Sequence, residues 1–107
     1  MTAYRLTPSA RASVDEINEY TAERWGEDQA AAYIDELFAE LSRIADRKVA
    51  WRALPSRLRI DGFRRSWRSH TIYWRSEPDD TITIVAVLHQ AMDQGARVPA
   101  AFRTAGD

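Results

Sequence analysis

Apolar residues in the first half of the chain recur with the spacing of an amphipathic helix. Thr7 and Pro8 predict where this helix starts, because threonine caps free amides and proline suits the first helical position. Gly26 predicts its end, since glycine tolerates the left-handed conformation common at helix C-termini. The apolar face of this helix comprises Ala10, Val14, Ile17, Thr21 and Trp25.

A second apolar stripe follows almost immediately. It comprises Ala30, Ile34, Leu37, Leu41 and Ile44, with Tyr33 and Phe38 beside it. Only residues 26–28 separate the two stripes, so the helices are expected to lie antiparallel as a helical hairpin. Both stripes then require a further apolar surface to cover them.

The second half of the chain changes to the two-residue alternation of β-strands. Segments 63–67 and 70–75 alternate and are joined closely, which predicts a β-hairpin. Residues 77–80, Glu-Pro-Asp-Asp, predict a turn. The strand expected over residues 81–88 is apolar on both faces, as a central strand is. Its expected faces are Ile82, Ile84, Ala86 and Leu88 on one side, and Val85 and Val87 on the other.

The remaining segments carry weaker patterns. Residues 3–6 alternate and predict a short N-terminal strand. Residues 47–54 are expected to form a last short helical turn, and Gly62 to make a turn into the next strand. Residues 93–107 show no clear period and are expected to form a flexible tail.

The composition is that of one folded domain. A chain of 107 residues predicts a single domain over residues 1–107, of the α+β class. The expected architecture is an N-terminal strand and an antiparallel helical hairpin packed on an antiparallel β-sheet. The lack of cysteine excludes a disulfide scaffold and a thiol nucleophile. No signal peptide or long apolar run is present, so a cytoplasmic location without membrane contact is expected.

Charge is distributed unevenly along the chain. Residues 1–46 carry ten acids and four bases, a balance of −6. Residues 47–76 carry nine bases and the single acid Asp61, a balance of +8, and all of these bases except Lys48 are arginines. Such a basic segment favours an anionic partner, either nucleic acid or an acidic polypeptide. The alternative is that the arginines pair with the acidic helices of the same molecule.

Several local motifs follow one another along these predicted elements. They are Tyr4-Arg5-Leu6-Thr7-Pro8-Ser9-Ala10, Tyr20, Trp25-Gly26, Gln29-Ala30, Gly62-Phe63-Arg64, His70-Thr71-Ile72-Tyr73-Trp74-Arg75 and the ending from Ile82 to Asp93. Their order and spacing over residues 3–93 resemble the RelE/ParE superfamily of bacterial toxins. The residues within these motifs are similar to those of its ParE branch. The resemblance implies the RelE/ParE-like fold, with the helical hairpin on a three-stranded antiparallel sheet.

The resemblance also implies a function, the toxin of a type II toxin–antitoxin system. A ParE-like toxin is expected to inhibit DNA gyrase without being an enzyme, to need no cofactor, and to form a hetero-oligomer with a ParD-like antitoxin. Operator DNA is then contacted only indirectly, through the antitoxin. Two alternatives stay open: a ribosome-dependent mRNA endoribonuclease of the RelE type, and a non-toxic subunit that still binds its antitoxin.

The chemistry of RNA cleavage bears on this choice. Cleavage needs a base for the 2′-hydroxyl, a cation for the phosphate and an acid for the leaving oxygen. The candidate groups are Arg64, Arg65, Tyr73, Arg75 and His89. Gln90, Ala91 and Met92 follow His89, however, where the RelE resemblance implies a basic or aromatic catalytic residue. Arginine is also a poor general base because of its high pKa. The sequence therefore favours the gyrase inhibitor, with no catalytic residue.

The binding residues are predicted from charge and aromatic character. The antitoxin's C-terminal segment is expected to cover an apolar surface at the boundary of hairpin and sheet, with its acids on arginines. The predicted antitoxin-binding residues are Trp51, Arg64, Arg65, Trp67, Arg68, Tyr73 and Arg75. The candidates for gyrase contact and toxicity are His89, Gln90, Met92 and Arg97.

The tryptophans and histidines have structural interpretations as well. Trp25 is expected in the core, and Trp51 is expected to be exposed. His89 either titrates in a groove or bonds a backbone carbonyl at the end of its strand. His70 is 19 residues from His89, which is not metal-ligand spacing, so no metal site is expected.

Overall fold

Five strands form one mixed sheet that carries helices on both faces. The computed structural model describes residues 3–91 and 94–105. The elements in chain order are β1 (Tyr4–Leu6), α1 (Pro8–Trp25), α2 (Glu27–Ala45), β2 (Arg52–Ala53), the short 3-10 helix η1 (Ser56–Leu58), β3 (Phe63–Trp67), β4 (His70–Ser76), β5 (Ile82–His89) and α3 (Gln94–Ala105). The strand order is β1-β5-β4-β3-β2, with β1 parallel to β5 and the other pairs antiparallel. The α+β prediction is confirmed.

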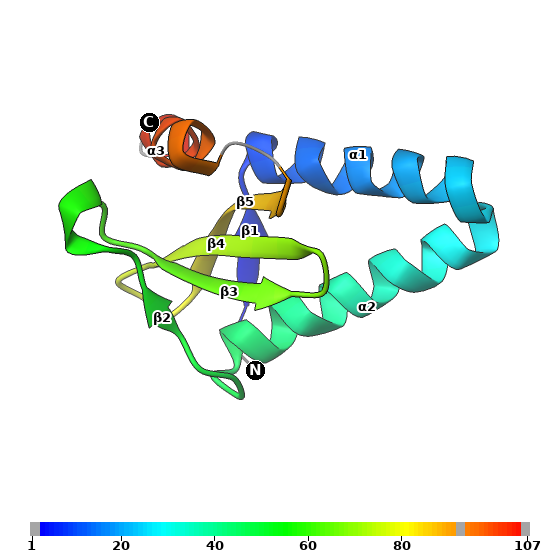
Figure 1. The fold of residues 1–107 in the computed structure, drawn as a ribbon. Helices are drawn as coiled ribbons and strands as arrows, with labels where there is room; N and C mark the ends of the chain where they lie inside the picture. Colours follow the sequence, from blue (N-terminus) through cyan, green and yellow to red (C-terminus); the bar gives the residue numbers. More distant parts are fainter. Residues whose placement is uncertain (1–2, 92–93, 106–107) are drawn as a thin grey trace.

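Helix α1 is attached to the sheet through Thr7, the residue that caps its start. The Thr7 side chain accepts a hydrogen bond from the Ala10 amide (3.0 Å) and donates one to the Val85 carbonyl (3.2 Å). The Thr7 amide also donates to the Ile84 carbonyl of β5 (3.0 Å). Gly26 alone, with φ of 94°, joins α1 to α2, because only glycine adopts such a conformation without strain. The predicted helical hairpin is confirmed (Figure 1).

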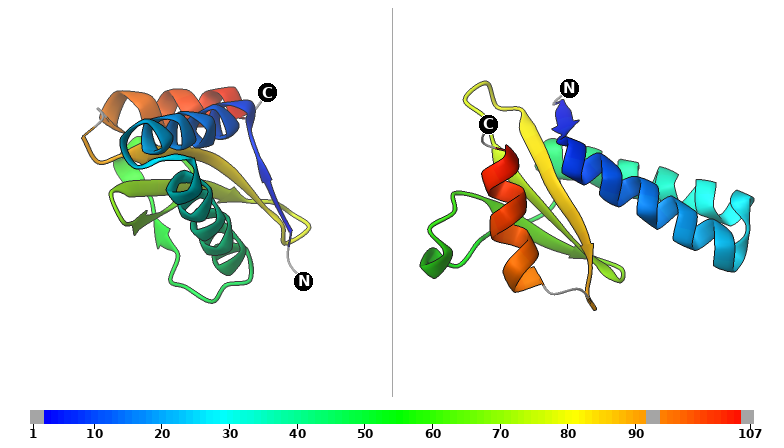
Figure 2. Two further views of the ribbon diagram at one scale, coloured as in Figure 1. Left: turned by 90° about the vertical axis from the view of Figure 1, so that its right-hand side faces the viewer. Right: turned by 90° about the horizontal axis from the view of Figure 1, so that it is seen from above.

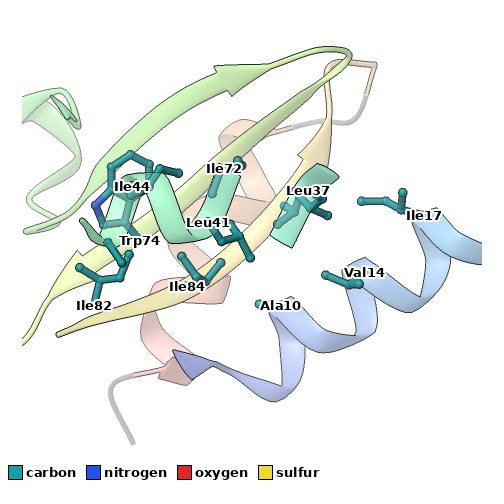
Figure 3. Close-up of a cluster of buried hydrophobic side chains, with 12 residues drawn as sticks. Ala10, Val14, Ile17, Leu37, Leu41, Ile44, Ile72, Trp74, Ile82 and Ile84 are labelled. Carbon is teal, nitrogen blue, oxygen red and sulfur yellow. The ribbon is translucent and has the colours of Figure 1, made fainter. Parts of the chain in front are cut away.

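The hairpin and one face of the sheet enclose the larger hydrophobic core. Figure 3 shows side chains of α1, α2, β4 and β5 pointing into a common interior. The labelled residues are Ala10, Val14, Ile17, Leu37, Leu41, Ile44, Ile72, Trp74, Ile82 and Ile84. Each fully buried leucine or isoleucine of this set contributes about 1.5–3 kcal/mol relative to exposure. The two stripes predicted from the sequence therefore meet the sheet that they require.

A β-bulge changes which residues of β5 face the hairpin. Tyr73 pairs with Ala86 but the next residue, Trp74, pairs with Ile84, so Val85 is the extra residue in the ladder. The expected faces of this strand are confirmed up to Val85 and wrong beyond it. Val87 joins the hairpin core with Ile82 and Ile84. Val85, Ala86 and Leu88 lie on the other face. One inserted residue reverses all alternation that follows it.

Helix α3 covers that second face of the sheet. Residues 94–105 are helical, so the prediction of a tail without an element of its own is wrong. Val98 and Phe102 are buried against Leu54, Tyr73 and Val85 in a second core cluster. In the right-hand view of Figure 2, the strands lie between α3 and the helical hairpin. The apolar spacing of Val98 and Phe102 is helical, but Pro99 between them is a residue that usually interrupts helices.

The segment after α2 extends the sheet instead of adding a helical turn. Arg52 and Ala53 pair with Arg64 and Phe63 of β3, so the prediction of helix over residues 47–54 is wrong. The Leu54 amide continues this ladder by donating to the Gly62 carbonyl (3.0 Å). Backbone pairing with a strand ten residues away, which local sequence does not encode, decides this conformation.

Gly62 is required for space. A Cβ atom placed on it would lie 2.6 Å from Phe102 Cε1 and 3.1 Å from Leu54 Cδ1. Gly62→Ala is therefore expected to lower the free energy of unfolding by about 1–2 kcal/mol, because it overpacks the α3 core. Urea unfolding measures this loss. Adding Phe102→Leu should restore part of the lost free energy of unfolding, since leucine lacks the ring edge that the new methyl meets. Equal stability of Gly62→Ala and the parent would contradict this packing.

Candidate functional site

A groove of about 940 Å³ runs between α1 and α3. Its floor is formed by residues 86–89 of β5, and the β3–β4 turn with Arg68, Ser69 and His70 also lines it. Small residues of α3, Ala100 and Ala101, line it together with Ile17 of α1. The groove is therefore largely apolar and has charged residues at its margins, the composition of a peptide-binding groove.

Two aromatic side chains of α1 line this groove and are exposed. Tyr20 is 57% exposed and Trp25 is 61% exposed. The prediction that Trp25 lies in the core is wrong. The end of α1 extends past the sheet, so no strand covers its last turn (Figure 1). Helical spacing shows which side of a helix is apolar, but it does not show how far the covering surface reaches.

The two histidines meet where the groove joins the β3–β4 turn. His70 and His89 are directly opposite on β4 and β5, with ring centroids 5.2 Å apart and rings nearly perpendicular. His70 Nδ1 lies 3.2 Å from the Tyr33 hydroxyl. His89 Nδ1 accepts a hydrogen bond from the Ala91 amide (3.0 Å). The predicted bond from His89 to a backbone carbonyl is thus corrected to one from a backbone amide, which still orders the strand end.

The environment of His70 disfavours its charged form. Burial lowers the pKa of His70 below its usual value, and the nearby His89 lowers it further. We expect the folded protein to be less stable below a pH of about 6.5, because the unfolded chain there binds a proton that the folded His70 does not. The contribution of neutral His70 to stability is complete above that pH. It is lost as the pH falls through the pKa of His70 in the folded protein.

Thermal unfolding at pH 7.5 and 5.5 measures this dependence, and His70→Gln should weaken it. NMR titration of the ring protons gives an independent reading, since the chain contains two histidines. A His70 midpoint at or above the value of a free histidine would contradict the prediction.

Most of the predicted antitoxin-binding arginines already have partners within the chain. Arg65 lies 2.5 Å from the Glu40 carboxylate, and Arg68 lies 2.5 Å from that of Glu36. Both acids belong to α2, so the intramolecular interpretation of the basic segment is confirmed for these two arginines. Arg75 pairs with Glu77 at 3.0 Å. Arg64 differs, since its side chain makes no ion pair within the described ranges 3–91 and 94–105.

The predicted aromatic contacts are mostly internal. Trp51 is half-buried, donates its indole N–H to the Ile44 carbonyl (3.0 Å) and packs on Phe63, so the prediction that it is exposed is wrong. Trp67 is half-buried against Tyr33, with ring centroids 5.2 Å apart. Tyr73 is buried on the α3 face and donates its hydroxyl to the Gln94 side chain.

The predicted toxicity residues cluster only in part. His89 and Arg97 line the groove from β5 and α3. Gln90 is exposed and donates to the Arg68 carbonyl (3.2 Å), which supports the β3–β4 turn. Met92 lies outside the described residues. No sequence signal identified Tyr20 as a groove residue. Tyr20 lies four residues before Arg24, a spacing typical of an exposed helical pair, and the Arg24 guanidinium lies over its ring.

The nuclease-type residues do not converge. Tyr73 and Arg64 lie on or beside the α3 face, whereas Arg65 is held on the hairpin face by Glu40. Burial raises the pKa of Tyr73, and the nearby Arg64 partly offsets this. A protonated, buried phenol is a poor base. The His89 ring packs on His70, three ladder pairs away from Tyr73, and His70 in turn contacts Tyr33 of α2.

The described part of the chain has neither a metal-binding cluster nor a membrane-spanning helix. Within it, no group of three or more histidine, cysteine, aspartate or glutamate residues could hold a metal ion. None of its helices is long and apolar enough to cross a membrane.

The comparisons with known proteins agree with this architecture. The family model "ParE toxin of type II toxin-antitoxin system, parDE" matches residues 4–94. Toxin ParE1 of Mycobacterium tuberculosis is 42% identical over 91 residues, covering 84% of this chain and 91% of the relative. Toxin ParE1 of Caulobacter vibrioides is 35% identical over 99 residues, covering 92% and 99%.

The fold is also that of a solved toxin–antitoxin structure, described as the chromosomal ParDE TA system from P. aeruginosa. It superimposes with a TM-score of 0.67 at 15% identity, over 83% of this chain and 96% of the other. The chain belongs to the ParE toxin family of type II toxin–antitoxin systems.

Proposed function

We propose that this ParE toxin acts by binding DNA gyrase, performs no catalysis itself, and is neutralised by a ParD-like antitoxin. The observation that carries the non-catalytic part is that Tyr73 and Arg65 lie on opposite faces of the sheet, with Tyr73 packed on the α3 face and Arg65 held on the hairpin face by Glu40. RNA cleavage needs such groups within hydrogen-bond reach of one phosphate. The proposal that gyrase is the target rests on membership of the ParE family, because resemblance to that family implies this target. Operator DNA is reached through the antitoxin.

The groove between α1 and α3 is the proposed antitoxin site. A partner segment with apolar side chains would bury Tyr20 and Trp25, and rigid aromatic anchors of this kind dominate the energy of many interfaces. Acidic side chains of the segment would meet Arg68 and Arg97 at the margins. The antitoxin thus covers hydrophobic surface that the toxin alone leaves exposed.

Expression of the full chain without its antitoxin tests the mode of action. Growth arrest with filamentation and a DNA-damage response is the expected result, and purified toxin should block supercoiling by gyrase. Immediate loss of translation with cut transcripts would instead support the ribonuclease. The absence of any phenotype would support the non-toxic subunit.

Binding of the antitoxin to toxin variants tests the groove. Tyr20→Ala and Trp25→Ala are each expected to weaken binding roughly 30-fold, the loss typical of an interface hot spot. Asn18→Ala is the matched control, because Asn18 is also exposed on α1 but does not line this groove. Equal affinity of all three variants would place the antitoxin elsewhere.

A further inference from the structure

Four arginines at one end of the sheet make no ion pair with any residue that the structure describes. They belong to the β2–β3 arm, residues 52–64, which includes η1. Within the described chain, no ion pair or side-chain hydrogen bond is made by Arg52, Arg57, Arg59 or Arg64. In Figure 1, and in the right-hand view of Figure 2, η1 lies at the end of the molecule opposite the α1–α2 turn.

The arm carries four arginines and a single acid, Asp61. Arg52 and Arg64 are directly opposite on β2 and β3, and like charges in such a pair destabilise a sheet. Asp61 is the only acid between residues 47 and 76. The acidic part of the molecule, residues 1–46 with a balance of −6, forms β1 and the helical hairpin. The separation of charge would orient the arm toward a polyanion.

The backbone conformation of Arg59 is a second unfavourable feature of the arm. It ends η1 in the left-handed conformation, with φ of 53°. This conformation favours glycine or asparagine and is unfavourable for a long side chain. The arm therefore presents an exposed guanidinium at a position where the backbone would prefer another residue.

The surface of the arm distinguishes between two kinds of anionic partner. A protein partner is bound mainly through apolar and aromatic anchors. In the described chain, the exposed large hydrophobic residues are Tyr20 and Trp25, both on α1. The arm offers charge without such anchors, and guanidinium groups match phosphate geometry. Charge supplies essentially all of the non-specific affinity for a phosphate backbone, so no apolar anchor is required there.

We propose that the β2–β3 arm binds the phosphate backbone of duplex DNA, independently of base sequence. This contact is direct, unlike the operator contact made through the antitoxin. It does not rest on gyrase inhibition, because a toxin that binds DNA through this arm does so without gyrase.

Fluorescence anisotropy with the purified full chain and a labelled duplex of about 20 base pairs tests the proposal. If four phosphates are neutralised, log affinity falls with log salt at a slope of about −3.6, or roughly 100-fold between 50 and 200 mM. Arg57→Gln/Arg59→Gln should reduce this loss to roughly 10-fold. Two duplexes of unrelated sequence should bind equally.

The matched control is Arg11→Gln/Arg24→Gln, which removes two exposed arginines of α1 and should leave the salt slope unchanged. Arg59→Gly separates binding from folding, since it should weaken DNA binding without lowering the melting temperature. The proposal is overturned if the duplex does not bind at 50 mM salt, or if both double variants behave alike. Tighter binding of polyglutamate than of DNA would overturn it in favour of an acidic polypeptide.

Discussion

Replacing Trp74 by alanine is expected to lower the free energy of unfolding by about 3–5 kcal/mol. Trp74 is fully buried and lies in the hairpin core between Trp51 and Phe63. Its removal leaves a cavity between β4 and α2 that neighbouring side chains fill only partly. Because a domain of this kind is stable by about 5–15 kcal/mol, the loss is a large fraction of the total. Urea unfolding measures it through the transition midpoint.

The chain supplies a matched control for this experiment. Trp25→Ala deletes the same side chain from a site that is 61% exposed, and should change stability by less than about 0.5 kcal/mol. Trp74→Phe should cost less than Trp74→Ala, since it keeps a ring and removes an indole N–H that has no partner in the described structure. Equal losses for the two alanine variants would contradict the assignment of Trp74 to the core.

Removing the cation beside Glu40 is the second large effect. Glu40 is buried on α2, with Arg65 at 2.5 Å and Arg43 at 3.6 Å. Arg65→Met is expected to lower the free energy of unfolding by about 2–3 kcal/mol, because a buried carboxylate loses its main partner. The loss stays below that of a fully isolated charge since Arg43 remains. Chemical unfolding of the single variant provides the measurement.

A double variant identifies the cause. Glu40→Leu combined with Arg65→Met removes both charges, so stability should return close to the parent value. Breaking the exposed pair with Glu36→Gln, next to Arg68, should cost no more than about 1 kcal/mol. If the double variant were as unstable as Arg65→Met alone, lost packing of the arginine stem would explain the effect, and the charge would not.

Elements set by local periodicity were predictable. The stripe from Ala30 to Ile44 and the alternation around Ile72 identify their helix and strand because side-chain period depends only on neighbouring residues. Thr7 and Gly26 identified both ends of α1 for the same local reason. The turn before β5 also matched, with Asp80 at φ of 69°.

Features that depend on distant residues were not predictable. Strand β2 exists because the backbone of Arg52 and Ala53 pairs with β3, and α3 is placed by the contact of Phe102 with Gly62. The bulge at Val85 has no signature in a run of β-branched residues. Its position is decided by the register of β4.

The sequence did not show the surroundings of the candidate site residues. Arg65 and Arg68 were predicted to bind the antitoxin, and each also pairs with an acid of α2, because charge in a sequence does not show which opposite charge lies near it. Trp25 was predicted to be buried and is exposed, whereas Trp51 was predicted to be exposed and is packed. Their exposure depends on where the sheet ends.

By itself, the sequence determined the helical hairpin, the antiparallel strands and membership of the ParE family, because each rests on local spacing and residue identity. Only the tertiary structure decided which side chains remain available for partners. The groove below Tyr20 and the unpaired Arg64 result from how α1, α3 and the sheet edges are placed. Surface availability is what remains after all internal contacts are made, and those contacts join residues far apart in the chain.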